Sequence, residues 1–253
     1  MNPSASRPLI LLANDDGQAR RGIRTMREVL SKDADVVIVA PEVEQSAASH
    51  ALSLHRPLRL RRVEDGVFAV DGTPADCVYV ALHHPRVLPR RPDLVVSGLN
   101  HGLNLGQDVF YSGTVAAARE GALRGIPAIA ASAAREVDRQ AACQVVARLA
   151  ANLLERWPGV SPRTPLLNVN FPPKWTGEVS VTRIGSRNYE ELLDIRRDPR
   201  GREYFWLGGS GVTHAPEAGT DTDAHDAGVA SVTPLVLDLT AYDDRAAANA
   251  LIA

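Results

Sequence analysis

Two adjacent carboxylates are the residues best suited to chemistry. They are Asp15 and Asp16, in the stretch Asn14-Asp15-Asp16-Gly17 that follows an apolar run over residues 9–13. Neighbouring acids repel one another, and a divalent cation offsets that repulsion better than a helix N-terminus or solvent. A solvated turn is the competing interpretation, because Asn, Asp and Gly are common turn formers. The rest of the chain favours the metal site.

Two further loops can supply neutral oxygen ligands beside these acids. Ser46 lies in a loop over residues 42–53, and Asn100 follows an apolar run over residues 94–97. Open α/β folds bind ligands at the edge where parallel strands end. Ser46 and Asn100 therefore complete an all-oxygen site that suits Mg²⁺, Mn²⁺ or Ca²⁺ rather than zinc. Two carboxylates neutralise one such ion and leave the site able to bind a phosphate dianion.

A glycine-rich loop and the helix after it are the candidate phosphate-binding features. The loop contains Gly98, Gly102 and Gly106. Glycines tolerate positive φ and let backbone N–H groups approach a ligand, although this spacing is not the dinucleotide GxGxxG. Ser112 and Thr114 then lead into a predicted helix whose free N–H groups and positive dipole end can bind an anion. Either residue can cap the helix as well, since capping and anion binding use the same donors.

The elements that must position these residues alternate between apolar runs and amphipathic segments. Continuous apolar runs bounded by Gly, Pro, Asn or Asp are typical of buried parallel strands. These runs cover residues 9–13, 36–40, 94–97, 128–132 and 166–169. Helices are predicted over residues 22–31, 74–83, 114–124 and 137–156. The βαβ order predicts an α/β fold with a doubly wound, mostly parallel sheet.

The pattern changes after residue 172. Residues 179–184 and 203–207 are predicted as antiparallel strands of a protruding β-hairpin around Asp198-Pro199-Arg200-Gly201. Residues 229–237 form a predicted strand, and residues 241–252 an Ala-rich helix in a C-terminal tail. We therefore divide the chain into a catalytic core over residues 1–175, a hairpin extension over 176–228 and a C-terminal strand and helix over 229–253.

Composition limits the classes of partner. The chain has 28 basic and 30 acidic residues and a formal charge of −2, which is no footprint for a nucleic-acid polymer or an anionic membrane. Cys77 and Cys143 are too few for a disulfide framework or a thiolate zinc site. The apolar run near the N-terminus is too short for a signal sequence or a membrane span. We expect a cytoplasmic protein.

Two other groups of possible ligands are weaker candidates. His83 and His84 follow a predicted helix without partner acids at ligand spacing. The segment 220–226 is rich in Asp and contains His225, but a charged loop before a strand is usually only solvated.

The chain resembles the SurE (survival protein E) family of metal-dependent nucleotidases from Leu9 to about Thr240. The matching stretches are ILLANDDG at 10–17, VVIVAPEVEQSAAS at 36–49, DGTPADCVYVAL at 71–82 and the long, specific segment 92–132. Weaker matches are LLNVNFP at 166–172, DPRG at 198–201 and GTDTDAHDAGVASVTPL at 219–235. The family usually has Pro where this chain has Arg21, and Gly where it has Ala47. Both departures bear on substrate preference more than on chemistry.

The resemblance implies a set of site residues and an assembly. By position, the residues that correspond to the family's metal ligands are Asp15, Asp16, Ser46 and Asn100. Those that correspond to its phosphate- and substrate-binding residues are Asn14, Asn104, Ser112, Gly113 and Thr114. It also implies a Rossmann-like core with a hairpin extension. The resemblance implies one divalent metal ion per subunit, Mg²⁺ or Mn²⁺, and Ca²⁺ can also occupy the site. The implied assembly is a homodimer or homotetramer in which C-terminal segments exchange between subunits.

The expected activity is that of a 5'-nucleotidase, a phosphomonoesterase that hydrolyses nucleoside 5'-monophosphates by attack of a metal-activated water. Nucleoside 3'-monophosphates and polyphosphate remain open as further substrates. Asp15 and Asp16 are the catalytic candidates, and which one acts as general base is left open. Aspartyl-phosphate phosphatases place their nucleophile two residues before a second Asp, a position that Asn14 occupies here. A non-catalytic nucleotide- or metal-binding module is the remaining alternative.

Overall fold

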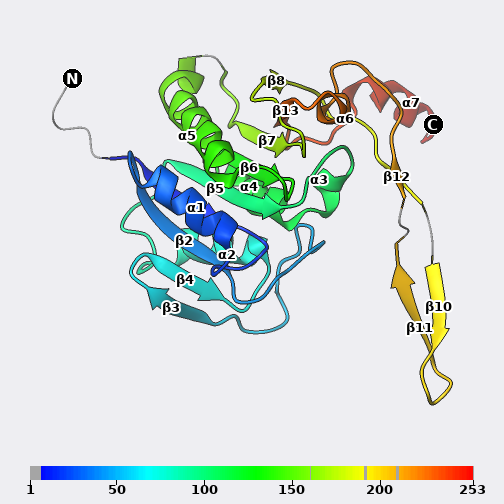
Figure 1. Ribbon diagram of the computed structural model, residues 1–253, viewed down its shortest axis with the longest axis horizontal. Helices are drawn as coiled ribbons and strands as arrows, with labels where there is room; N and C mark the ends of the chain where they lie inside the picture. The colour runs from blue at the N-terminus through cyan, green and yellow to red at the C-terminus, as the bar shows by residue number, and fades with distance from the viewer. Residues whose placement is uncertain (1–6, 160, 191–192, 209–210, 253) are drawn as a thin grey trace.

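The computed structural model describes residues 7–159, 161–190, 193–208 and 211–252. Within these residues, a nine-stranded sheet forms the centre of the protein (Figure 1). Six neighbouring strands run parallel, in the order β4 (Val67–Val70), β2 (Asp35–Pro41), β1 (Leu9–Ala13), β5 (Leu94–His101), β6 (Ala128–Ala133) and β7 (Leu166–Phe171). Three more strands complete the sheet. β3 (Leu60–Glu64) is antiparallel to β4, β13 (Ala230–Leu235) is antiparallel to β7, and β8 (Val179–Val181) is parallel to β13. The mostly parallel α/β sheet predicted from the sequence is confirmed.

The strand order changes direction between β1 and β5. The chain adds β2 and β4 on one side of β1, then returns to place β5 on its other side, with Ala13 opposite Ser97. In open α/β sheets such a switch point leaves a crevice beyond the carboxyl ends of the two strands. The turn after β1 and the glycine-rich loop at the end of β5 both open into this crevice.

Helices cover both faces of the sheet, as the βαβ order requires (Figure 1). α1 (Arg21–Leu30) and α5 (Arg139–Arg156) pack on one face, where Ile23 and Met26 join Ile129 in a buried core. α2 (Pro74–His83) and α4 (Gly113–Leu123) pack on the other, where Val78 and Val115 are fully buried. The four predicted helices are confirmed, with ends that differ by at most two residues.

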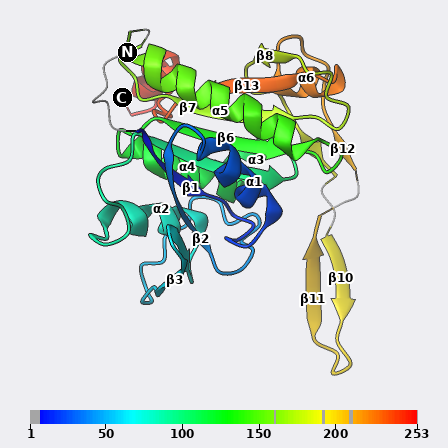
Figure 2. The same ribbon diagram turned by 60° about the vertical axis from the view of Figure 1, so that its left-hand side comes forward.

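The projecting hairpin has a different first strand from the predicted one. β10 (Leu193–Arg197) pairs with β11 (Glu203–Leu207) around the Asp198 turn, and Figures 1 and 2 show this pair extending away from the sheet. Residues 179–184 instead contribute β8 to the central sheet. The prediction was wrong because it joined two strands through a long connection, whereas hairpin loops are typically about two to five residues.

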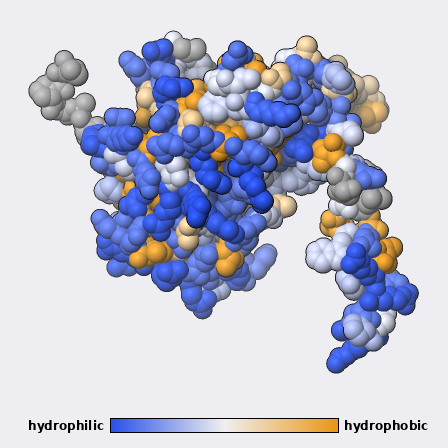
Figure 3. All heavy atoms as spheres, viewed as in Figure 1, coloured by the Kyte–Doolittle hydropathy of each residue, from blue (hydrophilic) through white to orange (hydrophobic). Residues whose placement is uncertain are grey.

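Smaller elements connect these parts. They are α3 (Asp108–Tyr111), η1 (Trp157–Gly159), β9 (Asn188–Tyr189), β12 (Val212–Thr213), α6 (Asp221–Asp226), η2 (Tyr242–Asp244) and α7 (Arg245–Ala250). The predicted C-terminal helix is present only as η2 and α7. Figure 3 shows a largely polar surface with apolar side chains on the hairpin. Ile195 and Phe205, on the two strands of the hairpin, are both exposed. No helix in the described part of the chain is both long and apolar enough to cross a membrane, and the N-terminal residues 1–6 lie outside that part.

Candidate active site

The turn after β1 is held by Asn14. Its side-chain oxygen accepts a hydrogen bond from the Gly17 N–H at 3.1 Å, and its amide nitrogen donates to the Gly17 carbonyl at 3.0 Å. Gly17 has a φ of 103°, a backbone conformation that residues other than glycine rarely adopt. Asn14 is fully buried, so its amide serves the turn that presents the next two residues, Asp15 and Asp16.

Asp15 is buried against the start of α4. The Thr114 hydroxyl donates to Asp15 Oδ1, and Ser112 caps the helix by accepting a hydrogen bond from the Val115 N–H at 3.1 Å. A Cβ atom on Gly113 would lie 2.9 Å from the Asp15 Cβ, so only glycine permits this approach. Burial raises the pKa of Asp15 from 3.8 to about 6; repulsion from Asp16 adds to this effect and the Thr114 hydrogen bond opposes it.

Asp16 is more open than Asp15 and lies among groups of both signs. Its Oδ2 accepts a hydrogen bond from the backbone N–H of His101 at 3.3 Å. Burial raises the pKa of Asp16, and the nearby carboxylate of Glu44 raises it further, while the His101 N–H and the Arg20 guanidinium lower it. Two carboxyls with raised pKa values on adjacent residues would be stabilised in their ionised forms by a bound cation.

Ser46 lies on a loop that is fastened to α3 and α4. The Ser49 N–H donates to the Tyr111 carbonyl at 2.9 Å, and His50 Nε2 lies 2.9 Å from Glu120 Oε2. The Ser46 hydroxyl donates to Glu44 Oε1 at 2.8 Å. These contacts hold a neutral oxygen and an additional carboxylate on the side of the crevice opposite β5.

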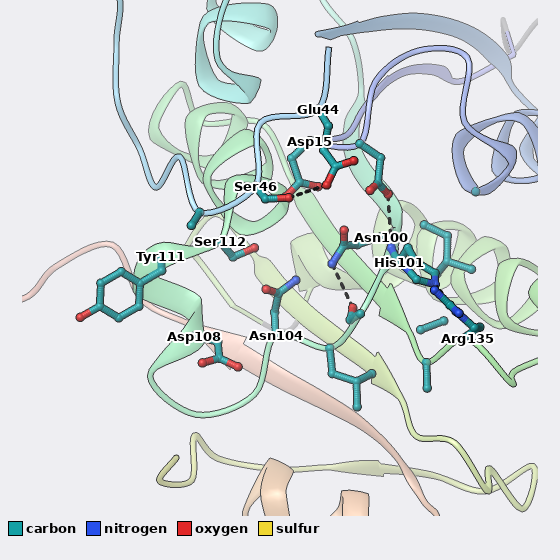
Figure 4. A pocket seen from close by; sticks show the side chains of 18 of the residues that line it. Asp15, Glu44, Ser46, Asn100, His101, Asn104, Asp108, Tyr111, Ser112 and Arg135 are labelled. Atoms are coloured by element: carbon teal, nitrogen blue, oxygen red, sulfur yellow. Dashed lines mark hydrogen bonds between the residues drawn. The ribbon is translucent and has the colours of Figure 1, made fainter. Parts of the chain in front are cut away.

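Asn100 has its amide oriented by the glycine-rich loop. Its nitrogen donates to the Gly102 carbonyl at 2.9 Å, and Figure 4 shows its oxygen on the side facing Asp15 and Ser46. The glycines of the loop have φ values of 133° at Gly98, 118° at Gly102 and 52° at Gly106. The prediction that this loop uses positive φ is therefore confirmed.

Asn104 is held at the end of the same loop by buried polar contacts. Its backbone N–H donates to Asn170 Oδ1 at 2.8 Å, and its side-chain nitrogen donates to the Ser132 hydroxyl at 2.7 Å. Asn168 donates to the Asn104 carbonyl at 2.8 Å. β6 and β7 thus determine where this residue meets the crevice.

These residues surround one cavity of about 1230 Å³. Of the residues that the sequence points to, those lining it are Asp15, Asp16, Ser46, Asn100, Asn104 and Ser112. Asn14, Gly113 and Thr114 do not line it and instead contact the turn or Asp15. Sequence reasoning missed Glu44, although it lies two residues before Ser46 in the same loop. It also gave no role to His101, Arg135, Arg139 or Tyr189, which join the cavity walls.

The donor set fits a hard divalent cation. Two carboxylates, one hydroxyl and one amide oxygen converge on the cavity, and oxygen ligands are those that Mg²⁺ and Mn²⁺ prefer. In the part of the chain that the structure describes, no group of three or more His, Cys, Asp and Glu side chains could hold a metal ion. A metal at this edge of the sheet would therefore depend on Ser46 and Asn100 as well as on the two carboxylates.

Comparison with known proteins identifies the family. The family model for survival protein SurE matches residues 10–191. The chain belongs to the SurE family. A 5'-nucleotidase SurE of Sorangium cellulosum is 59% identical, with 98% of this chain and 96% of the relative aligned. A 5'-nucleotidase SurE of Geobacter metallireducens is 48% identical over 92% of this chain and 93% of its own length.

A solved SurE structure has the same fold. The crystal structure of a SurE protein from Aquifex aeolicus aligns with a TM-score of 0.82 and 37% identity. The alignment covers 97% of this chain and 100% of that one. This chain therefore shares its overall fold with a SurE relative.

Ala47 keeps a left-handed backbone in this SurE chain. Its φ is 55°, which costs about 1 kcal/mol for a residue with a Cβ atom. We expect Ala47→Gly to increase the free energy of unfolding by about that amount. Chemical denaturation measures it, with Ala48→Gly as the control, because Ala48 does not have a positive φ and should gain nothing. Equal effects of the two substitutions would contradict the strain at Ala47.

Proposed function

We propose that this chain is a metal-dependent phosphomonoesterase that hydrolyses nucleoside 5'-monophosphates to nucleoside and phosphate. The observation that supports this most is the convergence of Asp15, Asp16, Ser46 and Asn100 on one cavity beside the start of α4. SurE relatives that align over more than nine-tenths of both chains carry the name 5'-nucleotidase. The non-catalytic alternative is not favoured, because a binding module has no need to bury an acid whose ionised form is unfavourable.

Asp15, Asp16, Ser46 and Asn100 are the residues that would hold one divalent ion, Mg²⁺ or Mn²⁺. When bound, the ion supplies positive charge to a phosphate oxygen and lowers the pKa of a water. Asn104 and Ser112, which face the same cavity, are proposed to orient the phosphate. Asn14, Gly113 and Thr114 are proposed to act through the position of Asp15 rather than by touching the substrate.

Phosphate release from purified protein tests the proposed function. Adenosine 5'-monophosphate, adenosine 3'-monophosphate and tripolyphosphate are compared with Mg²⁺, with Mn²⁺ and with excess EDTA. We expect the 5'-monophosphate to be hydrolysed in either metal and not after chelation. Nucleotide binding without phosphate release in both metals would favour the non-catalytic alternative, and full activity in EDTA after dialysis would contradict the metal.

The raised pKa of Asp15 predicts how pH affects stability. A carboxyl group with a folded-state pKa near 6 stabilises the metal-free protein below pH 4, and this contribution is lost as pH rises through 6. Metal binding requires the ionised form. We therefore expect Mg²⁺ to raise the unfolding temperature more at pH 7 than at pH 5. Asp15→Asn should remove the difference, and a shift in the parent protein that is equal at both pH values would contradict the prediction.

We propose that the protein is a homodimer or homotetramer and that C-terminal segments exchange between subunits. Within one chain, α7 has no buried residue, and Leu239 and Leu251 are 80% and 88% exposed. Apolar side chains left in water at both points favour burial against another copy. Light scattering should give a mass of two or more chains, and truncation after Leu237 should change it. A monomeric mass that truncation leaves unchanged would contradict this assembly. A cytoplasmic location stays a prediction from the sequence.

A further inference from the structure

One wall of the active-site cavity carries more positive charge than a single phosphate requires. Arg20, Arg21, Arg135 and Arg139 all line it. Arg20 is paired with Glu44 at 2.8 Å. Among the described residues, no carboxylate forms a salt bridge with Arg21, Arg135 or Arg139. Three arginines without a salt bridge therefore line one cavity.

The fold places these arginines beside the metal ligands. α1 and α5 each follow a parallel strand, so both begin at the edge of the sheet where the crevice opens. A Cβ atom on Gly22 would lie 2.1 Å from the Leu99 carbonyl oxygen, so α1 packs directly against the residue before Asn100. Arg135 Nε donates to His101 Nε2 at 3.2 Å, and the His101 N–H donates to Asp16. Figure 4 shows Arg135 beside His101.

The positions of Arg20 and Arg21 are unfavourable for the fold alone. Arg20 is the N-cap residue of α1 and Arg21 its first residue, and this helix has no side-chain cap and no acid in its first turn. Arg139 begins α5, which the Asp138 carboxylate caps by accepting hydrogen bonds from the Gln140 and Ala141 N–H groups. A cation at the positive end of a helix costs roughly 0.3–1 kcal/mol. An anion bound at the start of α1 would offset that cost. The guanidinium group suits a phosphoryl group, because its fork of N–H donors can bind two oxygens at once.

The remaining acids of the cavity do not neutralise this wall. Asp15 and Asp16 are the carboxylates proposed to hold the cation, and Asp108 is paired with Arg187 at 2.8 Å. Glu190 is exposed and belongs to the base of the hairpin, next to β9. A divalent cation and two carboxylates sum to zero charge, so the three unpaired arginines carry one positive charge more than a single phosphate dianion neutralises. This excess positive charge favours a ligand that carries a second anionic group.

We propose that Arg21, Arg135 and Arg139 form a subsite for a second phosphoryl group, and that nucleoside 3',5'-bisphosphates are a preferred substrate class. This rests on the proposed phosphomonoesterase function. The volume of about 1230 Å³ exceeds the range of roughly 300–1,000 Å³ usual for small-molecule pockets. Leu103, Tyr111 and Tyr189 supply apolar and aromatic surface for a nucleoside, which a polyphosphate does not need.

The reaction needs no reactant besides water. Water forms a bond to phosphorus and becomes part of inorganic phosphate, the ester P–O bond breaks, and the sugar oxygen takes a proton. The second phosphoryl group stays on the nucleoside, so the product is a nucleoside monophosphate. The arginines bind this spectator group and are expected to act on KM rather than on kcat.

Substitution at Arg21 can be made without disturbing the fold. Arg21 is the first residue of α1, Arg20 before it has the extended φ and ψ of −70° and 148°, and proline is favoured at a first helical position. Arg21→Pro with Arg139→Gln removes two of the three charges. Arg86→Gln with Arg148→Gln is the matched control, because both arginines are exposed and neither lines the cavity.

Steady-state kinetics with Mg²⁺ on adenosine 3',5'-bisphosphate, adenosine 5'-monophosphate and tripolyphosphate tests the subsite. We expect the parent protein to have a kcat/KM about 10-fold higher for the bisphosphate than for the monophosphate. In the Arg21→Pro, Arg139→Gln variant this ratio should fall to near one through KM, while the monophosphate changes less than about twofold. The control variant should keep the ratio.

Three results would overturn the subsite. They are a parent protein without preference for the bisphosphate, a preference that the variant retains, and a loss in the variant confined to tripolyphosphate. Calorimetric titration of both nucleotides in EDTA separates this inference from the proposed function. The bisphosphate should still bind more tightly than the monophosphate to the parent protein, and equally in the variant. Absence of all hydrolysis, with this binding difference present, would contradict the phosphomonoesterase and leave the arginine subsite standing.

Discussion

Asp16→Asn is expected to reduce both metal affinity and turnover by at least 10–100-fold, the loss that even indirect partners of a metal typically produce. The substitution keeps the size and shape of the side chain but removes one of the two charges proposed to hold the cation. The His101 N–H can still donate to the amide oxygen, so the loop should stay in place. Calorimetric titration with Mg²⁺ or Mn²⁺, beside kinetics on a nucleoside monophosphate, measures both effects.

Thr114→Val is the matched comparison for Asp16→Asn. Thr114 is fully buried, and its hydroxyl donates to Asp15 without lining the cavity. Its removal should cost about 1–3 kcal/mol of stability, while metal still binds, because both carboxylates remain. Loss of the hydrogen bond should also raise the pKa of Asp15 further. If Asp16→Asn binds metal and turns over like the parent protein, the metal assignment at residues 14–17 is wrong.

Gly113→Ala is expected to lower turnover by about 100-fold, because displacements near 1 Å at a reacting centre have effects of that size. The new Cβ would lie 2.9 Å from the Asp15 Cβ and 3.0 Å from Pro74 Cγ. Pro74 belongs to the first turn of α2, which Thr73 and Asp76 fix by a reciprocal pair of capping hydrogen bonds. Asp15 is therefore the group that must move, and overpacking of this kind also costs about 1–3 kcal/mol.

Gly121→Ala separates displacement of Asp15 from general instability. Gly121 lies two turns further along α4, where a Cβ would meet Val95 Cγ2 at 2.5 Å, far along the helix from the site. Thermal unfolding and kinetics of both variants, measured below their unfolding temperatures, provide the comparison. Similar losses of stability with a much larger loss of kcat in Gly113→Ala support the positioning role. Equal losses of kcat would contradict it.

Local patterns in the sequence were sufficient for the elements of the core. The run over residues 9–13 is apolar throughout and is buried along its whole length in β1, as both faces of a parallel strand are covered. Thr73, Pro74 and Asp76 together specify the start of α2, which the sequence placed at the correct residue. β3 was not predicted because it is mostly charged and has no buried residue, whereas the four-residue apolar run of β4 was overlooked.

The polar residues that follow the strands were also identifiable from the sequence. Asp15, Asp16 and Asn100 come after strands whose carboxyl ends must share one edge of a parallel sheet, so their convergence follows from the order of the elements. Ser46 needed the additional assumption that its loop folds back toward that edge. The glycines at 98, 102 and 106 indicated positive φ by their residue type alone.

Tertiary structure alone decided what those residues touch. Because α4 begins next to the turn after β1, the Thr114 hydroxyl donates a hydrogen bond to Asp15. The sequence alone does not show whether Thr114 contacts Asp15 or is open to a phosphate. The pKa of Asp15 near 6 depends on burial by segments distant in the chain. The arginine wall arises because two helix starts, more than one hundred residues apart, meet at one edge. Residue type determines which groups can ionise or bend the backbone, whereas burial and charge at a site come from packing between segments that are remote in sequence.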